Sequence, residues 1–251
     1  MKIFVINLIG KRMTAAITSA TLLLTVLLAS VIGLAFKEYT FNIDAEGVDG
    51  IPYDKIIILD AGHGGEDSGA VGVNGVLEKD LNLQIALEIG RIFEEKNYVV
   101  VYTRTDDHLL YTEEQNIKGI RKINDLKNRC RFAEKYPESI FISIHMNSFG
   151  SAKYSGLQVY YSGNNEESRL LADTIQNRVA TDIQKDNKRV IKQGNDMYIL
   201  ENINNTAVLI ECGFLTNEEE CKKLSEKEYQ KQLSFSIVCG IIEYIEKYNQ
   251  E

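Results

Sequence analysis

A short apolar run that ends in polar and glycine residues limits what this chain can fold into. Residues 56–59 are three isoleucines and a leucine, followed by Asp60, two small residues, His63 and two glycines. A strand that is apolar at every position is buried on both faces, as in parallel sheets that helices cover on both sides. The sequence therefore predicts a histidine at the carboxyl end of a buried strand.

Strand-like and helix-like segments alternate along the rest of the chain. Apolar residues recur at three- and four-residue intervals from Leu81 to Phe93, as on one face of a helix. The patterns predict strands at 56–59, 98–103, 140–144, 156–161 and 207–210, and helices at 81–93, 126–136, 168–183 and 225–245. Ser225 and Glu228 have the spacing of a capping box for the last helix. This alternation predicts an α/β fold, a three-layer α/β/α domain with a mainly parallel mixed sheet.

The N-terminal 36 residues differ from the rest of the chain. Lys2, Lys11 and Arg12 precede residues 13–36, a run of 24 residues without a charge. As a helix this run is about 36 Å long, enough to cross a hydrocarbon layer of about 30 Å and longer than a cleavable signal or a soluble helix needs. The positive residues before it place the N-terminus in the cytoplasm. We expect a cytoplasmic segment at 1–12, an uncleaved transmembrane signal anchor at 13–36, a connector at 37–54 and one exported domain at 55–251.

Charge and cysteine usage limit the class of partner. Without the first 36 residues the chain has 25 basic and 36 acidic residues, a net charge of −11. Nucleic-acid binding depends on neutralising phosphates, so this domain is not expected to bind nucleic acid. The four cysteines form no C-x-x-C pair: Cys130, Cys212, Cys221 and Cys239. We expect unpaired structural thiols, although an exported domain permits disulfides and the pairing stays open.

Polar side chains follow three of the predicted strands: His63, His145 and Glu211. The carboxyl ends of parallel strands meet at one edge of a sheet, where ligands gather, so we expect these side chains to lie close together. Glu78 adds a carboxylate at the start of the first helix. Two imidazoles and a carboxylate are a donor set that suits zinc, with one coordination position left for water. His63, Glu78 and His145 are therefore candidate zinc ligands.

Structural roles compete with metal binding at each of these positions. A single buried histidine is commonly satisfied by backbone hydrogen bonds, and a glutamate at a helix N-terminus is favoured by the helix dipole alone. The convergence of two histidines with carboxylates at one edge favours a metal. The stretch GHGGEDSGAVGVNG lacks both G-x-x-x-x-G-K-S/T and G-x-G-x-x-G entering a helix, so it does not predict a phosphate-binding loop.

Four segments, in order, resemble the signatures of a known family. They are IILDAGHGGEDSGAVGVNGVLEKDLNL, VVYTRTDD, FISIHMNS and AVLIECGFLTN. They resemble the zinc-dependent N-acetylmuramoyl-L-alanine amidases of bacterial cell walls over nearly the whole predicted domain. The resemblance implies that His63, Glu78 and His145 bind one zinc ion and that Glu211 is the catalytic residue.

Other motif positions are expected to hold loops rather than to take part in the chemistry: Asp60, Arg104, Asn147 and Asn217. The sequence departs from the family pattern at two places. Glu201 follows residues 197–200 where relatives often have a basic residue, which leaves a substrate contact there open. The stretch 108–123 is longer and more charged than usual, and we assign no role to its histidine, His108.

The resemblance also implies a reaction, the hydrolysis of the amide between the lactyl group of N-acetylmuramic acid and L-alanine in peptidoglycan. Zinc lowers the pKa of a water molecule from about 15.7 toward 7 and polarises a carbonyl. Glu211 would take the water proton and return it to the departing nitrogen, a role worth about 10²- to 10⁴-fold. Residues 55–251 would then be the catalytic domain of a single-pass protein, outside a bacterial cell membrane.

An anchored catalytic domain without wall-binding repeats resembles the sporulation subgroup, which acts on spore cortex so that muramic δ-lactam forms for germination. An accessory protein partner is compatible with this, and the sequence does not identify one. Three alternatives stay open: a vegetative autolysin of the same activity, a zinc peptidoglycan peptidase or deacetylase with the same metal set, and a noncatalytic wall-binding protein. A noncatalytic protein would be expected to lack the general base, whereas Glu211 is present.

Overall fold

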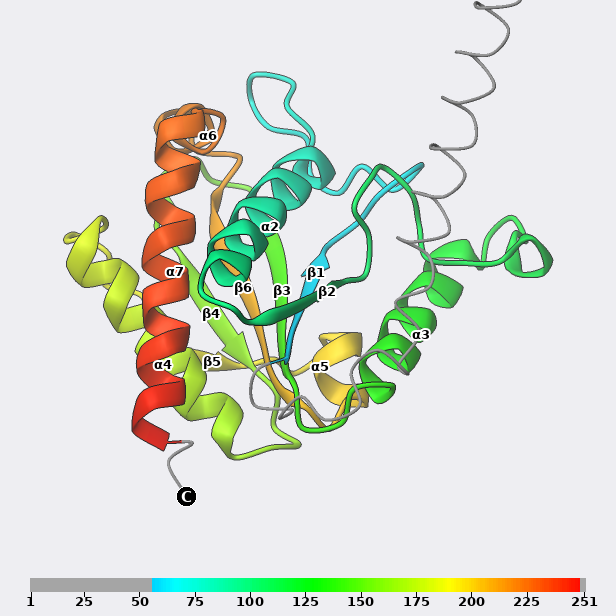
Figure 1. The fold of residues 1–251 in the computed structure, drawn as a ribbon. Helices are drawn as coiled ribbons and strands as arrows, with labels where there is room; N and C mark the ends of the chain where they lie inside the picture. Colours follow the sequence, from blue (N-terminus) through cyan, green and yellow to red (C-terminus); the bar gives the residue numbers. More distant parts are fainter. Residues whose placement is uncertain (1–55, 249–251) are drawn as a thin grey trace, which may run out of the picture. The chain divides into compact units, whose positions relative to one another are not determined.

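The computed structural model describes residues 56–248 (Figure 1). In chain order the elements are β1 Ile56–Ala61, α2 Glu78–Glu95, β2 Val99–Tyr102, the 3-10 helix η3 Glu113–Gln115, α3 Arg121–Glu134, β3 Ile140–Asn147, β4 Gln158–Tyr161, α4 Glu167–Asp182, β5 Lys192–Gln193, α5 Tyr198–Asn202, β6 Thr206–Phe214, α6 Glu218–Leu224 and α7 Lys227–Tyr248. Each of the predicted strands and helices corresponds to one of these elements.

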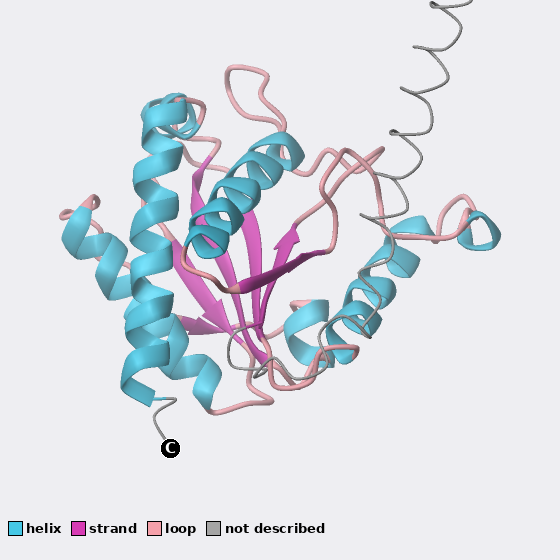
Figure 2. Ribbon diagram, in the orientation of Figure 1, coloured by secondary structure: helices cyan, strands magenta, loops and turns pink. Residues whose placement is uncertain are grey.

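Six strands form one sheet in the order β2-β1-β3-β6-β4-β5 (Figure 2). β1 pairs in parallel with β2 and β3, and β3 pairs in parallel with β6. β4 runs antiparallel to β6 and parallel to β5. The predicted α/β fold with a mainly parallel, mixed sheet is confirmed.

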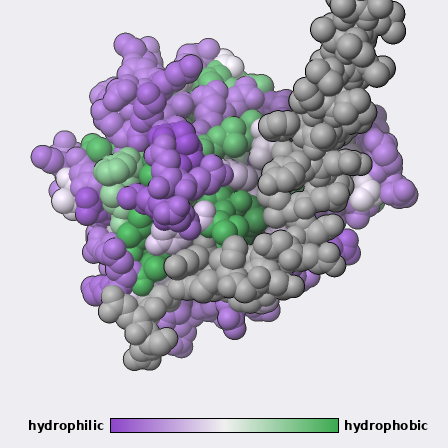
Figure 3. All heavy atoms as spheres, viewed as in Figure 1, coloured by the Kyte–Doolittle hydropathy of each residue, from purple (hydrophilic) through white to green (hydrophobic). Residues whose placement is uncertain are grey.

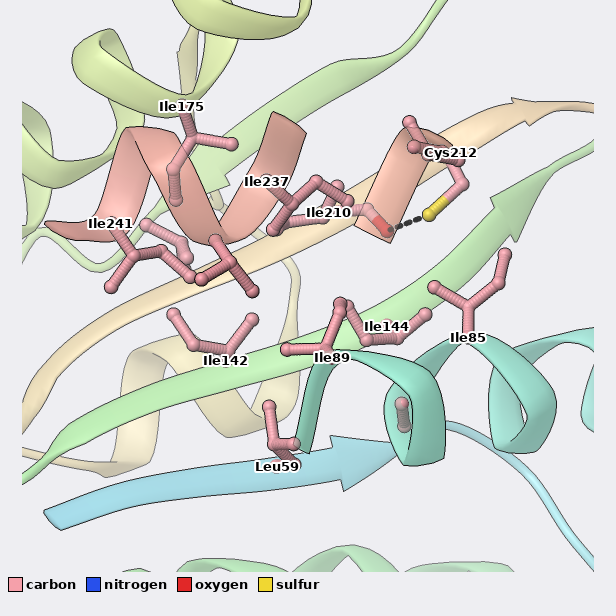
Figure 4. Close-up of a cluster of buried hydrophobic side chains, with 14 of the residues drawn as sticks. Leu59, Ile85, Ile89, Ile142, Ile144, Ile175, Ile210, Cys212, Ile237 and Ile241 are labelled. Atoms are coloured by element: carbon pink, nitrogen blue, oxygen red, sulfur yellow. Dashed lines mark hydrogen bonds between the residues drawn. The ribbon is translucent and has the colours of Figure 1, made fainter. Parts of the chain in front are cut away.

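One face of the sheet packs against α2, α4 and α7. Side chains alternate between the two faces of a strand, and in β3 Ile140, Ile142, Ile144 and Met146 point into this core. Figure 4 shows strand and helix side chains meeting there, among them Leu59, Ile85, Ile142, Ile175 and Ile237. Burying a side chain of this size stabilises the fold by about 1.5–3 kcal/mol. The apolar face thus holds the strands in register.

The other face of the sheet carries polar residues near the ends of the central strands. In β3, Ser143 and His145 alternate with the core residues and point to this side. Helix α3 lies here, because Arg129 of α3 donates a hydrogen bond to Asp60 of β1. Helix α5 packs against α3 and β6. Helices therefore lie against both faces of the sheet (Figure 2).

Four short elements were not predicted: η3, β5, α5 and α6. β5 has two residues and α5 has five, too few to show a period. α6 begins after Asn217, whose side chain accepts a hydrogen bond from the backbone N–H of Glu220, and three glutamates fill its first turn. An asparagine cap before acidic residues is a signal that could have found this helix.

The predicted capping box at Ser225 is wrong. The Ser225 hydroxyl donates to the carbonyl of Cys221, 2.7 Å away, and Ser225 is the C-terminal cap of α6. Helix α7 begins only at Lys227. Ser225 thus lies two residues before the first helical residue of α7, outside the N-cap position, and its hydroxyl contacts the preceding helix instead, so the tertiary arrangement overrides the local spacing.

No helix within residues 56–248 is long and apolar enough to cross a membrane. The predicted transmembrane segment at 13–36, with the flanking segments 1–12 and 37–54, lies outside the described residues. The surface of the described part in Figure 3 is mainly hydrophilic, with hydrophobic residues showing between the polar ones. Its four cysteines are free thiols, and Cys130, Cys212 and Cys221 are buried.

Candidate metal centre and active site

The predicted convergence of polar side chains at one edge of the sheet is confirmed. β1, β3 and β6 are neighbouring parallel strands, so their carboxyl ends lie together. His63 follows the end of β1, and His145 of β3 is the direct register partner of Glu211 in β6. Segments far apart in the sequence thus deliver two imidazoles and a carboxylate to one place.

His63, Glu78 and His145 form a cluster that could hold a metal ion. One ligand atom from each of the three residues lies within 4.8 Å of the others. Oε1 of Glu78 is 3.2 Å from Nε2 of His63 and 3.0 Å from Nδ1 of His145. The two imidazole rings meet edge to face with their centroids 4.9 Å apart. Two neutral imidazoles and a carboxylate converging on one point match the donor set that zinc takes.

Glu78 is the first residue of α2, and its two oxygens are held by separate segments. Oε2 accepts a hydrogen bond from the backbone N–H of Ala70 at 2.7 Å, and Oε1 accepts one from the N–H of Met146 at 3.1 Å. The sequence left two explanations for Glu78, a favourable charge at the helix N-terminus and a metal ligand. In the structure the same side chain has both positions. Its pKa is lowered: burial by itself raises it, but contacts with His145 and His63 outweigh burial.

The carboxylates around His63 favour positive charge at this position. Burial alone would lower the pKa of His63, but the nearby carboxylates of Asp67 and Glu78 raise the pKa to about 9. A site that stabilises a protonated imidazole through two carboxylates also stabilises a cation that takes the place of the proton. Metal binding at this cluster should therefore release a proton.

Glu211 is a half-buried carboxyl group beside the cluster. Its Oε2 atom is inaccessible to solvent and has no hydrogen-bond partner among the described residues. Burial raises its pKa to about 7; His145 and His63 oppose this shift and Glu78 adds to it. A buried carboxylate without a partner costs free energy, which indicates a functional rather than a structural reason for its position. A pKa near neutrality suits a group that accepts a proton and returns it.

A pocket of about 240 Å³ lies beside the two imidazoles and the carboxyl group of Glu211. His63, His145 and Glu211 line it together with Met197 and Tyr198 at the start of α5. The segment at which the sequence left a substrate contact open thus forms a wall of the pocket. Glu201 is exposed and accepts a hydrogen bond from the backbone N–H of Asp196, so it supports its own loop instead.

A larger hollow of about 750 Å³ lies elsewhere, between α4 and β5. Its lining includes Glu166, Glu167 and Asp173 but no histidine or cysteine. It therefore lacks the nitrogen and sulfur ligands that a catalytic zinc site uses, and the chemistry is assigned to the smaller pocket.

Comparison with known proteins identifies the family. Residues 57–243 match the family model of N-acetylmuramoyl-L-alanine amidases. The chain belongs to this family. It is 34% identical over 223 residues to the germination-specific N-acetylmuramoyl-L-alanine amidase of Bacillus subtilis, covering 88% of this chain and 93% of that protein.

Solved structures agree with this assignment to the amidase family. The CwlD amidase from Clostridioides difficile, in complex with the GerS lipoprotein, matches with a TM-score of 0.73 and 40% identity, covering 76% of this chain and 98% of that chain. The catalytic domain of the amidase CwlV from Bacillus (Paenibacillus) polymyxa var. colistinus matches with a TM-score of 0.64 and 32% identity. The match covers 76% of this chain and 98% of that chain.

Two buried arginines tie the loop after β1 to the rest of this amidase. Arg104 donates to the carbonyls of Ala61 at 2.9 Å and Gly62 at 3.0 Å. Arg129 donates to the carbonyls of Ala61 at 2.9 Å and His63 at 2.8 Å. The backbone carbonyls of the loop that carries His63 are therefore held by hydrogen bonds from charged donors, which are stronger than those from neutral donors.

The positions expected to hold loops make such contacts. Asp60 is fully buried and accepts hydrogen bonds from Arg129, Ser143 and Thr103. Burial by itself would raise the pKa of Asp60, but Arg129 and the two hydroxyls outweigh burial and hold it below its ordinary value.

Two further expected loop positions lie near the ends of β3 and β6. Asn217 caps α6 and donates to the carbonyl of Ala152. Asn147 ends β3, where its backbone carbonyl accepts from the N–H of Leu215, a contact that does not involve its side chain. His108 is exposed and lies against Asp106.

Sequence reasoning missed two residues that line the amidase pocket, Asp67 and Lys122. Asp67 lies four residues after His63, with its Oδ2 atom 2.9 Å from Nδ1 of the imidazole. Lys122, near the start of α3, is 3.1 Å from the same oxygen. The i, i+4 spacing of an acid and a histidine was a weak signal in the sequence, because it indicates contact only within a helix.

Gly62 leaves the space that the ring of His145 occupies. A Cβ atom at Gly62 would overlap this ring, whereas at Gly150 it would meet open space. We expect Gly62→Ala to displace His145, weakening zinc binding about 10- to 100-fold and lowering the free energy of unfolding by about 1–3 kcal/mol. Zinc content after dialysis and urea unfolding measure both effects. Gly150→Ala is the control and should change neither; wild-type zinc binding by Gly62→Ala would contradict the expectation.

Proposed function

We propose that this chain hydrolyses the amide between the lactyl group of N-acetylmuramic acid and the L-alanine of the stem peptide, with one zinc ion bound by His63, Glu78 and His145. The observation that carries the proposal is the three-ligand cluster beside the unpartnered carboxyl of Glu211, in a chain of the amidase family. The donor set fits zinc, which would be held by three protein ligands and would have the pocket beside it for water and substrate.

A bound zinc ion supplies Lewis acidity, which acidifies a water molecule and polarises a carbonyl group. The residues of the chain have separate roles around it. Glu211 accepts the proton of the attacking water and returns it to the alanine nitrogen as the amide bond breaks. Breaking the C–N bond releases the stem peptide, with a free amino group on its L-alanine, and leaves the lactyl carboxylate on the sugar. Arg104 and Arg129 keep the loop of His63 in place through its backbone carbonyls.

We infer a role in the spore cortex, where removing stem peptides allows muramic δ-lactam to form for germination. The 34% identity to the germination-specific amidase of Bacillus subtilis supports this role. The likeness to an amidase solved with the GerS lipoprotein supports a lipoprotein as accessory partner. The uncharged residues 13–36 and the positive residues before them support a single-pass membrane anchor, with the catalytic domain outside the cytoplasm.

A defined substrate separates this function from the alternatives. Incubated with purified muropeptides, the chain should release intact stem peptides with a free N-terminal L-alanine, measured by mass spectrometry. A peptidase would instead cut between amino acids, and a deacetylase would release acetate. Muramic δ-lactam missing from the spores of a deletion strain would separate a cortex role from that of a vegetative autolysin.

Removing the metal should abolish the hydrolysis. Dialysis against a chelator empties a site whose ligands otherwise bind zinc, so stem-peptide release should fall to background and return when zinc is added in slight excess. The same dialysis without chelator is the control. Full activity in a preparation shown by elemental analysis to hold no divalent metal would refute the zinc mechanism.

A further inference from the structure

The imidazole of His63 lies between two carboxylates. Its Nε2 atom is 3.2 Å from Oε1 of Glu78 on the side of the candidate metal site. Its Nδ1 atom is buried and lies 2.9 Å from Oδ2 of Asp67 on the opposite side, without the alignment of a hydrogen bond to any described residue. A neutral imidazole carries one proton, and only the nitrogen without the proton offers a lone pair to a metal. The residue that takes the proton therefore determines which nitrogen binds.

We propose that Asp67 is a positioning residue for metal binding: it holds the proton of His63 on Nδ1 and presents Nε2 to the zinc. The inference rests on the proposed function for the identity of the metal. Carboxylates that accept a hydrogen bond from a ligating histidine fix its tautomer and ring orientation. His145 differs, because its Nδ1 atom is the one that faces Glu78.

The backbone of this loop brings Asp67 back to His63. Gly64 and Asp67 exchange two backbone hydrogen bonds of 3.0 and 2.9 Å, which close a tight turn. His63 itself has a φ angle of 62°, in the left-handed region that residues other than glycine rarely adopt. Such strain persists only where the surrounding structure holds it, commonly at functional sites. Arg129 contributes here by donating to the His63 carbonyl at 2.8 Å.

The two oxygens of Asp67 have different partners. Oδ1 accepts a hydrogen bond from the N–H of Gly69 at 3.3 Å, and Oδ2 faces His63. Lys122 also lies 3.1 Å from Oδ2, but its side chain is 62% exposed. Exposed ion pairs contribute little, so Lys122→Met should change zinc affinity by less than about 5-fold. The carboxylate of Asp67 therefore carries the effect.

Asp67→Asn tests the proposal, because an amide carries no negative charge and its single oxygen cannot face both Gly69 and His63. The zinc dissociation constant of the purified full-length chain is measured by competition with a chromophoric chelator. We expect Asp67→Asn to bind zinc about 10- to 100-fold more weakly than the wild type, with the metal-free proteins unfolding at the same urea concentration. A lower urea midpoint with unchanged zinc affinity would show a merely structural role and overturn the proposal.

Glu66→Gln is the matched control. Glu66 is the neighbouring exposed carboxylate, and it pairs with Arg121. This variant should bind zinc within about twofold of the wild type. Equal affinity of Asp67→Asn and Glu66→Gln would also overturn the proposal. Because zinc affinity is measured without turnover, it tests Asp67 even if the wild type releases no stem peptide, a result that would refute the proposed function alone.

Discussion

Glu211→Gln is expected to lose about 10²- to 10⁴-fold in the rate of stem-peptide release while it keeps its zinc. The amide is close in size to the carboxylate but cannot accept the water proton. Glu211 is not among the three clustered ligands, so the metal content should stay at one ion per chain. The rate is measured on defined muropeptides at saturating substrate, and the zinc by elemental analysis.

The stability of the same variant distinguishes a catalytic from a structural role. Oε2 of Glu211 is buried without a hydrogen-bond partner in the described part of the chain, so removing the charge should leave the free energy of unfolding unchanged or raise it. Glu219→Gln, at an exposed carboxylate that pairs with Lys223, is the control and should keep the full rate. A Glu211→Gln enzyme within about threefold of the wild-type rate would exclude the proton-transfer role.

Arg129→Met is expected to lower the free energy of unfolding by about 3–5 kcal/mol, a large part of the 5–15 kcal/mol typical of a domain. Arg129 is 2% exposed and pairs with Asp60, which is fully buried, and with Asp125, which is 5% exposed. Methionine fills the volume of the stem but leaves both carboxylates buried without a counter-charge. Urea unfolding followed by circular dichroism measures the change.

A second arginine on the same helix provides the control. Arg131 is exposed and donates to Asn128, so Arg131→Met should change stability by no more than about 0.5 kcal/mol. If Arg129→Met fails to fold, Arg129→Lys replaces it, because lysine keeps the charge but cannot reach both carboxylates with a planar guanidinium. The stability of Arg129→Lys should lie between that of the wild type and that expected for Arg129→Met. Equal stability of Arg129→Met and Arg131→Met would show that the buried ion pairs are not needed.

Local patterns in the sequence account for most of the fold. Strands buried on both faces are short continuous apolar runs, amphipathic helices repeat every 3.6 residues, and both patterns are properties of neighbouring residues. For this reason the strands that deliver His63, His145 and Glu211 were predictable, and so was their convergence at one edge, although β3 and β6 run on through His145 and Glu211 instead of ending before them. Short elements such as α5 contain too few residues to show a period. The start of α7 was misplaced because the Ser225 oxygen bonds the preceding helix.

The sequence by itself determined the fold class, the edge of the sheet where chemistry gathers and the identity of the candidate ligands. Only the tertiary structure decided how these ligands are supported. Arg129 and Asp60 are 69 residues apart, and they meet because α3 packs on the polar face of the sheet. Asp67 reaches the ring of His63 because a turn with a left-handed residue reverses the chain. Contacts of this kind depend on the path of the backbone in space, which no local spacing of residue types specifies.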